Sequence, residues 1–474
     1  MARKLWLFAG LVLGVAGCST PRNTTSVLQA AQTAMGNVSS IQYSGTGMNA
    51  FVGQALTAGE EWPRRDLSSF TRTINYEQRA SRDELNFAQP TFGGQQQNAQ
   101  VKGDKAWNMG PNGPAPQVAA AEGRQLQILL TPHGFVRAAL AAGTATLSGT
   151  EGASVISFTA LGNYKLNGTV DAQNLVTKIE TKRPDPVLGD TDVVAMFSDY
   201  KDFNGVKFPG KIMVTEGGFP SWDLTITNVT PNAPLELPVP EPVQAATLPP
   251  VQTASAKLAN GVWHVAGGSH HSLVVEFKDY IAVVEAPLSE ERSMAVLAEA
   301  KKLVPNKPVK YVLTTHHHFD HVGGLRTYVA EGATVVTHAS NVPYFEKTLT
   351  APATVVPDRQ GKDPKPPMLQ GVSEKEKYVI TDGKQTIEVY ATVGDTHTKE
   401  YTFIYLPGPK ILVEADAFSP GPPDAPPPAT PPPNAVALYD EIQRLKLNVA
   451  TIAPIHGRGA VPIAELRKFI GKKS

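Results

Sequence analysis

Cysteine is almost absent from this chain, which has one, Cys18, in 474 residues. A single thiol cannot form a disulfide within the chain, so neither half depends on one, and we expect no disulfide-linked partner. An excess of charge is absent as well, because 43 Lys and Arg residues balance 43 Asp and Glu residues. Since nucleic-acid-binding proteins usually carry a basic face, this balance argues against a nucleic-acid partner.

Residues 1–17 are expected to be a targeting segment, not part of the fold. "MARK" is basic, and the apolar run "LWLFAGLVLGVAG" after it is too short for a typical transmembrane helix. Cys18 then stands where cleavage would occur. The pattern resembles the lipobox of bacterial lipoproteins, which implies cleavage before Cys18 and a lipid on its sulfur. By the same resemblance, Ser19 implies an outer-membrane anchor facing the periplasm. A plain signal peptide or a short anchor is the alternative.

Residues 18–230 predict a mostly antiparallel β (α+β) domain. "TTSVLQAAQTAMG" predicts a helix that Thr24 or Thr25 caps and Gly36 ends, and alternating apolar runs follow from Ile41 onward. Asn204-Gly205 between two such runs indicates a β-hairpin. "TPHGFVRAALAAG" predicts a helix among the strands. "YKDFNGVKFPGKI" resembles lipoprotein-sorting carriers and their half-barrel relatives. No catalytic constellation is visible in this half.

Proline recurs without hydrophobic periodicity in residues 231–255, which predicts an extended linker and a domain boundary near residue 250. Residues 256–474 then alternate strand-like and helical patterns. Such alternation favours an α/β domain, in which helices pack against sheets.

Four of the eleven histidines lie in "THHHFDHVGG", directly after a buried strand. In an extended segment His316 and His318 point the same way, whereas Asp320 and His321 follow where the chain turns. His397, Asp416 and His456 each come after a later strand. Nitrogen and oxygen donors at several strand ends are the arrangement that a metal site needs, with Asp416 able to bridge.

The order "THHHFDHVGG", "GDTHT", "VEADAF", "IHGRG" resembles the motifs of the metallo-β-lactamase superfamily over residues 256–474. The resemblance implies an αββα sandwich with two metal ions at one edge between its sheets. It assigns the first ion to His316, His318 and His397. It assigns the second to Asp320, His321 and His456, with Asp416 bridging.

Two departures from the family pattern stand out. Glu285 takes the place of the usual aspartate after the second strand, which affects support of the ligands and not the ligands themselves. No cysteine ligand is present, so the set is more similar to the glyoxalase II type. His270 and His271 are open between contact with substrate and a solvated loop. The Pro-rich residues 419–435 are open between a lid and a disordered insertion.

The resemblance implies a dinuclear zinc hydrolase that cleaves a small ester, thioester or lactam with a metal-bound hydroxide. Iron or manganese are the other candidate metals. Asp320 would be the catalytic residue that orients the nucleophile. The partners expected are a small-molecule substrate and, through the lipid, a membrane. The alternatives are a β-lactamase proper and a non-catalytic envelope lipoprotein with a metal-stabilised binding domain. No substrate-binding residue is identified.

Overall fold

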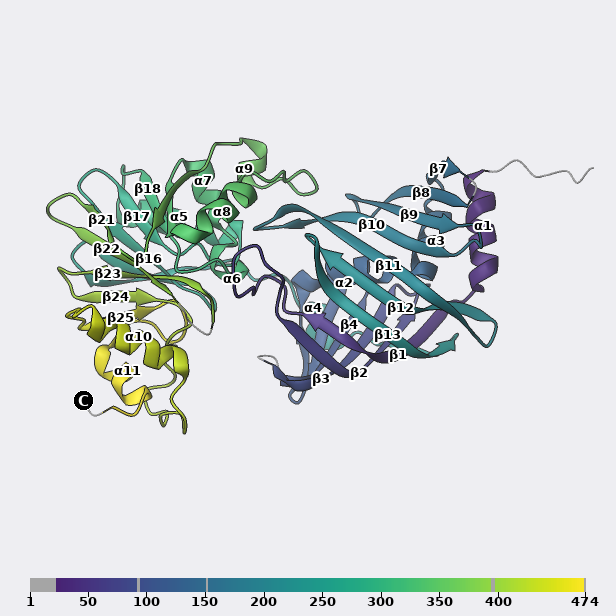
Figure 1. Cartoon of the computed structure of the whole chain (residues 1–474), viewed down its shortest axis with the longest axis horizontal. Helices are drawn as coiled ribbons and strands as arrows, with labels where there is room; N and C mark the ends of the chain where they lie inside the picture. The colour runs from purple at the N-terminus through teal and green to yellow at the C-terminus, as the bar shows by residue number, and fades with distance from the viewer. Residues whose placement is uncertain (1–22, 92–93, 151, 394–396, 473–474) are drawn as a thin grey trace, which may run out of the picture.

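A computed structural model describes residues 23–91, 94–150, 152–393 and 397–472. The chain forms two lobes, with the N-terminal half in one and the C-terminal half in the other (Figure 1). The expected targeting segment and Cys18 lie outside the described residues. Within these residues, no helix is both long and apolar enough to span a bilayer.

The N-terminal lobe is one curved antiparallel sheet in the strand order β6-β5-β4-β3-β2-β1-β13-β12-β11-β10-β9-β8-β7 (Figure 1). Its strands are β1 Ser40–Ala50, β2 Arg64–Asn75, β3 Ala80–Thr91, β4 Gly94–Lys102, β5 Lys105–Gly110, β6 Gly113–Pro116, β7 Thr146–Thr150, β8 Ala153–Ala160, β9 Tyr164–Asp171, β10 Val176–Asp185, β11 Gly189–Phe203, β12 Val206–Glu216 and β13 Phe219–Pro231. Its helical segments are α1 Thr24–Met35, η1 Val118–Ala120, α2 Ala121–Leu129 and α3 Pro132–Ala142. The helices pack on one face of the sheet and share its core.

Local signals explain these elements. Asn204 and Gly205 have φ values of 55° and 82° and turn the chain between β11 and β12, which confirms the expected hairpin. Helix α3 begins after Thr131, whose hydroxyl accepts from Gly134 N, and ends at Gly143 in the left-handed region. The cap of α1 is Asn23 and not a threonine, one residue earlier than expected.

The N-terminal lobe encloses a cavity of about 590 Å³. Its lining combines apolar side chains such as Leu85 and Trp222 with the guanidinium groups of Arg65, Arg72 and Arg124. The lining also includes residues 49–52, where β1 ends and a long connection to β2 begins. One end of the cavity therefore adjoins the chain that leaves the sheet toward the other lobe.

The C-terminal lobe contains a seven-stranded sheet in the order β14-β15-β16-β17-β18-β19-β20 and a six-stranded sheet in the order β21-β22-β23-β24-β25-β26. The first sheet comprises β14 Ala254–Ala259, β15 Val262–Ala266, β16 Ser272–Glu276, β17 Ile281–Val284, β18 Val309–Leu313, β19 Thr334–His338 and β20 Met368–Val372. The second comprises β21 Tyr378–Thr381, β22 Thr386–Val393, β23 Glu400–Leu406, β24 Ile411–Glu414, β25 Thr451–Pro454 and β26 Val461–Pro462. The helical segments are α5 Glu290–Leu303, α6 Phe319–Val322, α7 Leu325–Glu331, η2 Ala339–Asn341, α8 Val342–Leu349, α9 Arg359–Lys362, α10 Pro433–Arg444 and α11 Ile463–Phe469.

Three apolar layers hold this lobe together. One lies between the first sheet and helices α5, α7 and α8, and includes Val296 and Tyr328. A second fills the space between the two sheets, with Val284 and Val413 fully buried. A third lies between the second sheet and helices α10 and α11, and includes Leu438. The order helix, sheet, sheet, helix confirms the predicted αββα sandwich after a largely antiparallel β domain.

The proline-rich residues between the lobes pack on the N-terminal sheet. They contain a short helix, α4 Glu241–Ala245. Leu235, Leu237 and Val243 are buried there against Trp107 and Ala80. These contacts fix much of the connection on the N-terminal lobe.

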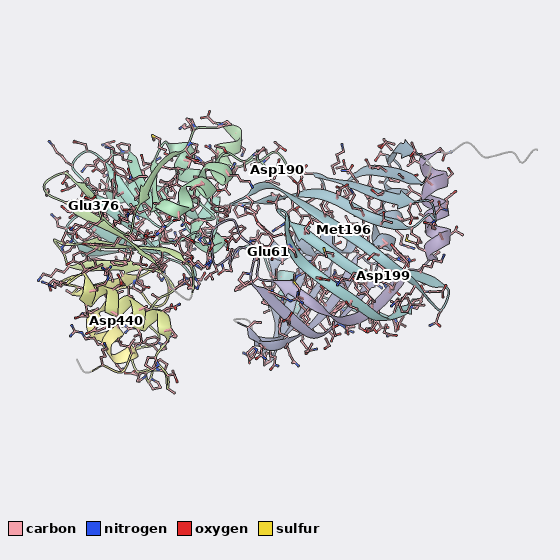
Figure 2. All side chains as sticks on the ribbon, viewed as in Figure 1. Glu61, Asp190, Met196, Asp199, Glu376 and Asp440 are labelled. Atoms are coloured by element: carbon pink, nitrogen blue, oxygen red, sulfur yellow. The ribbon has the colours of Figure 1, made fainter. Side chains whose placement is uncertain are left out.

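Two parts of the N-terminal lobe reach the C-terminal lobe. At the β10–β11 turn, Asp190 N donates to Pro352 O over 2.7 Å, and Thr354 N donates to Asp190 Oδ1 over 2.8 Å. Val187 in the same turn is buried in the core beneath α5 and α7. Figure 2 shows Asp190 and Glu61 on the side of the N-terminal lobe that faces its neighbour. Glu61 belongs to the β1–β2 connection, which extends to α6 (Figure 1).

Candidate metal centre

The seven predicted ligands follow the carboxyl ends of strands in both sheets of the C-terminal lobe. The chain after β18 carries His316 and His318, and helix α6 directly after it carries Asp320 and His321. In the second sheet, His397 follows β22, Asp416 follows β24 and His456 follows β25. β17 and β18 run parallel in the first sheet, and β24 and β25 run parallel in the second, so within each sheet the loops after these strands leave at the same edge.

The structure brings all seven side chains together. In one group, the donor atoms of His316, His318 and His397 lie within 4.8 Å of one another. A second such group comprises His270, Asp320, His321 and His456. Asp416 lies between them. Its Oδ2 is 2.8 Å from His321 Nε2 and 3.5 Å from His316 Nε2, and its Oδ1 is 3.2 Å from His456 Nε2.

Three imidazoles of this cluster, those of His316, His318 and His321, turn one nitrogen toward a partner outside the seven ligands and leave the other for the cluster. His316 Nδ1 lies 3.0 Å from Thr315 Oγ1, which leaves Nε2 facing His397 Nε2 at 3.3 Å. His318 is held through Nε2, and its buried Nδ1 has no hydrogen-bond partner among the described residues. Such pre-set tautomers and orphaned lone pairs fit metal ions as the missing partners.

Asp416 sits in a tightly fixed turn. Its φ is 61°, in the left-handed region that aspartate tolerates better than most residues. The backbone N–H groups of Ala417 and Phe418 donate to Glu414 Oε2 over 3.2 and 3.1 Å. Tyr401 Oη donates to Ala415 O over 2.6 Å. These bonds on both sides hold the Asp416 carboxylate at the cluster.

Glu285 is fully buried (0% exposed) and links the chain after β18 to a histidine of the cluster. Its Oε1 accepts from Thr315 N over 2.6 Å, and its Oε2 lies 2.8 Å from His321 Nδ1. A carboxylate on Nδ1 keeps that nitrogen protonated and leaves Nε2 of His321 as a ligand. The departure from the family pattern at this position therefore still provides the carboxylate that orients His321.

The structure places His270 in the cluster. The sequence alone does not decide between this position and a solvated loop. The His270 ring is buried (6% exposed), so a solvated loop is wrong for this residue. His270 Nε2 lies 3.2 Å from Asp320 Oδ2, and its ring is 4.1 Å from that of His456, centroid to centroid. His271 instead turns Nε2 to Gly457 O at 2.8 Å. The doubled histidine in "GGSHHSL" was the only sequence signal for this contact.

Burial and crowding set the protonation of the cluster. Burial lowers the pKa of His318 to about 3, and burial together with His321 lowers the pKa of His316 well below its ordinary value. Both are therefore neutral at pH 7, as metal ligands must be. Burial would raise the pKa of Asp416, but the nearby His321 outweighs it, and the carboxyl stays ionised. For His321, the Asp416 and Glu285 carboxylates overcome burial and raise its pKa.

One side of the cluster is open to solvent. Four of its side chains are partly exposed: Asp320 (36%), His397 (26%), Asp416 (21%) and His456 (18%). The His316, His318 and His321 rings beneath them are almost fully buried. Structural zinc sites are usually closed, whereas catalytic sites keep an open position. The open side therefore favours catalysis.

The residues that sequence reasoning missed altogether come from the N-terminal lobe. Gln54 Nε2 donates to Asp320 Oδ1 over 2.7 Å. The carbonyl oxygen of Ala55 lies 2.8 Å from His317 Nε2 and 3.0 Å from His318 Nε2. His317, which lies between two predicted ligands, is thus held by the other lobe.

Residues 419–435 are irregular up to the start of α10. Pro420 lies against Gly457, where an added Cβ would meet Pro420 O at 2.7 Å. Arg458 Nε donates to Gly421 O over 2.7 Å. The segment therefore starts beside the loop that carries His456 and borders the open side of the cluster.

Residues 265–456 match the family model described as the metallo-beta-lactamase superfamily. A curated relative, 2,4-dinitroanisole O-demethylase subunit alpha of Nocardioides sp. (strain JS1661), is 25% identical over 161 residues, which are 34% of this chain and 45% of the relative. A linear primary-alkylsulfatase of Pseudomonas sp. is 36% identical over 76 residues, 16% of this chain and 11% of the relative. The chain thus spans less than half the length of these curated relatives.

Among solved structures, a metallo-beta-lactamase from Pontibacter korlensis is 20% identical, with a TM-score of 0.36, and the match covers 46% of this chain and 98% of that protein. One from Hirschia baltica is 18% identical, with a TM-score of 0.35 and coverage of 47% and 99%. The family match and the layered architecture agree on the same half of the molecule. The C-terminal domain has the metallo-beta-lactamase fold, and residues 265–456 within it are similar in sequence to the metallo-beta-lactamase superfamily.

Proposed function

We propose that this protein is a metal-dependent hydrolase that uses a dinuclear zinc centre to cleave a small ester, thioester or lactam. The observation that carries the proposal is the convergence of seven donor side chains on an edge that is open on one side. A scaffold that uses metal only for stability has no need of that opening. This counts against the non-catalytic alternative.

In the proposed centre, His316, His318 and His397 would hold one ion, and Asp320, His321 and His456 would hold the other. Asp416 would serve both, because its two oxygens face imidazoles of both sets. Imidazole nitrogen and carboxylate oxygen suit zinc, and iron and manganese accept the same donors. His270 contacts Asp320 and belongs to the same group of donors as Asp320, His321 and His456.

When bound, the metal pair would polarise the scissile group and lower the pKa of a water molecule. The chain's own residues do the positioning. Asp320 is ionised, because hydrogen bonds from His270 and Gln54 and the nearby His321 outweigh burial and lower its pKa. Its partly exposed carboxylate is therefore an acceptor that can align an attacking water, and not a proton donor. Asp416 keeps the two sets of imidazoles at a fixed separation.

The chemistry of the site does not select one substrate by itself. A β-lactamase proper remains the second candidate, with no lactam-recognition motif in the sequence to favour it. The activities named for the two curated relatives add an alkyl sulfate and an aryl methyl ether to the substrates worth testing.

The first experiment is a substrate panel with the zinc-loaded chain from Ser19 onward. We expect chelator-sensitive turnover of a chromogenic cephalosporin, a nitrophenyl ester, a thioester, an alkyl sulfate or 2,4-dinitroanisole, and its loss in His316→Ala. His133→Gln, in the N-terminal lobe, is the matched histidine control. A protein shown to hold two metal ions that turns over none of these would contradict the proposal.

The lipid anchor is a separate proposal. We infer that Cys18 carries lipid and holds the protein at the outer membrane on the periplasmic side. The lobes that follow it need no disulfide in that compartment. Mass spectrometry of the mature N-terminus should show lipid-modified Cys18, and Cys18→Ser should move the protein from the membrane to the soluble fraction. An unmodified Cys18 in the full-length chain would argue for the plain signal or short anchor.

A further inference from the structure

We propose that residues 51–62 of the N-terminal lobe, here called the docking segment, are a built-in part of the metal centre and position His318 and Asp320 for metal binding. The segment is the connection between β1 and β2 and reaches α6 of the other lobe (Figure 1). The inference rests on the proposed metal centre and adds a role for the N-terminal lobe. It makes the two lobes one functional unit.

The first contact fixes an imidazole. The Ala55 carbonyl accepts from His318 Nε2 over 3.0 Å and from His317 Nε2 over 2.8 Å. A carbonyl oxygen has two lone pairs, so it can hold both rings at once. With the proton of His318 kept on Nε2, its buried Nδ1, which has no hydrogen-bond partner among the described residues, is the nitrogen free to bind metal in the group that His318 forms with His316 and His397. The docking segment thus sets both the tautomer and the direction of this ligand.

The second contact fixes a carboxylate. Gln54 Nε2 donates to Asp320 Oδ1 over 2.7 Å, while Asp320 Oδ2 lies 3.2 Å from His270 Nε2. Each oxygen therefore has its own partner, and the carboxylate cannot rotate freely. Partners of this kind, which hold a ligand without touching the metal, typically change metal affinity by about 10- to 100-fold.

The docking segment is itself held on both sides of the cluster. Phe319 N donates to Gly53 O over 3.2 Å, at the start of the helix that carries Asp320 and His321. Lys399 N donates to Leu56 O over 2.9 Å, two residues after His397. The segment therefore spans from the loop of the first histidines to the loop of His397.

Apolar packing makes the docking segment stiff. Ala55 and Trp62 are buried with Met48 and Ala50 of β1, and Phe319 packs against this cluster. Gly53 is required at its position, because its φ is +80° and an added Cβ would lie 2.5 Å from the Phe319 ring. The contact between lobes leaves no room for a side chain there.

Two glycines of the docking segment provide a matched test. Gly53 and Gly59 have nearly the same φ, +80° and +81°, so alanine adds similar backbone strain at both. Only Gly53→Ala meets the Phe319 ring, because the nearest atom to an added Cβ at Gly59 is Tyr344 Cδ2 at 3.4 Å. We expect Gly53→Ala to weaken zinc binding of the full mature chain by about 10-fold or more. Gly59→Ala should bind zinc like the wild type.

Gln54→Met provides a test that does not depend on the fold tolerating Gly53→Ala. Methionine keeps the length of the side chain and removes the donor to Asp320. We expect about 10-fold weaker binding at the site of Asp320, seen by chelator competition and by the visible spectrum of the cobalt-substituted protein. The melting temperature of the metal-free protein should stay that of the wild type. Leu56→Ala, which keeps the backbone carbonyl and alters only an exposed side chain, is the control.

Wild-type zinc affinity and an unchanged cobalt spectrum in Gln54→Met would overturn this inference. This outcome does not depend on whether the wild type and the variant turn over a substrate. Failure of the wild type to bind two metal ions would instead overturn the proposed metal centre. The two failures are thus separable by the metal content of the wild type.

Discussion

Asp416→Asn should lower the zinc affinity of the protein by at least about 100-fold and reduce the bound metal below two ions per chain. Asparagine keeps the shape of the side chain and tolerates the left-handed φ of 61°, so the change removes chiefly the charge. That charge lies within 2.8 to 3.6 Å of four imidazoles, those of His316, His321, His397 and His456. Without it, both sets of ligands lose their common anion.

The measurement is metal content after dialysis against metal-free buffer, followed by chelator competition. Asp424→Asn is the matched control, since Asp424 is exposed in the Pro-rich segment and belongs to none of the donor groups. If Asp416→Asn retained two ions with wild-type affinity, Asp416 would not bridge the proposed centre. Turnover of any substrate found in the panel should fall in parallel, because the ligands act as one unit.

Glu285→Gln should lower zinc affinity by about 10- to 100-fold, although Glu285 touches no open face of the site. Its Oε2 lies 2.8 Å from His321 Nδ1, and its Oε1 accepts from Thr315 N over 2.6 Å. If the amide oxygen keeps the bond from Thr315, the amide nitrogen faces His321 and donates to Nδ1. The proton of His321 then moves to Nε2, which is the atom that should bind metal.

Glu276→Gln on β16 of the same sheet is the control for this change, because Glu276 is partly exposed and pairs with Lys307. Nitrogen NMR of the metal-free protein, recorded at a pH above the raised pKa of His321, reports the tautomer of its neutral ring directly. We expect Nδ1 protonated in the wild type and Nε2 protonated in Glu285→Gln. Equal zinc affinity together with an unchanged tautomer would show that the carboxylate does not orient His321.

Much of the C-terminal lobe could be predicted from the sequence, because its signals are local. The alternation of strands and helices indicates the layers, and each predicted ligand follows its own strand directly. His316 and His318 also share one face of an extended segment, as the spacing of two predicts. The seven side chains therefore lie together in the structure as their positions after the strands suggested.

The support around the ligands could not be predicted in the same way. The partner of His318 is a backbone carbonyl of Ala55, and a carbonyl has no residue type to recognise. Gln54 lies 266 positions from Asp320 in another lobe, and a single sequence does not reveal such a contact. The sequence shows that Glu285 departs from the family pattern, but its hydrogen bonds to Thr315 and His321 depend on the fold.

The docking segment is also synthesised before the residues that it holds. Ala55 precedes His317 by 262 residues, so at a synthesis rate of about 5–20 residues per second it is made roughly 13–50 s earlier. N-terminal domains generally fold first. The template for His318 and Asp320 is then formed before the later part of the chain folds. The C-terminal lobe matures on a surface that is already formed, and a chain with its two halves in the reverse order would have to build its metal site without that surface.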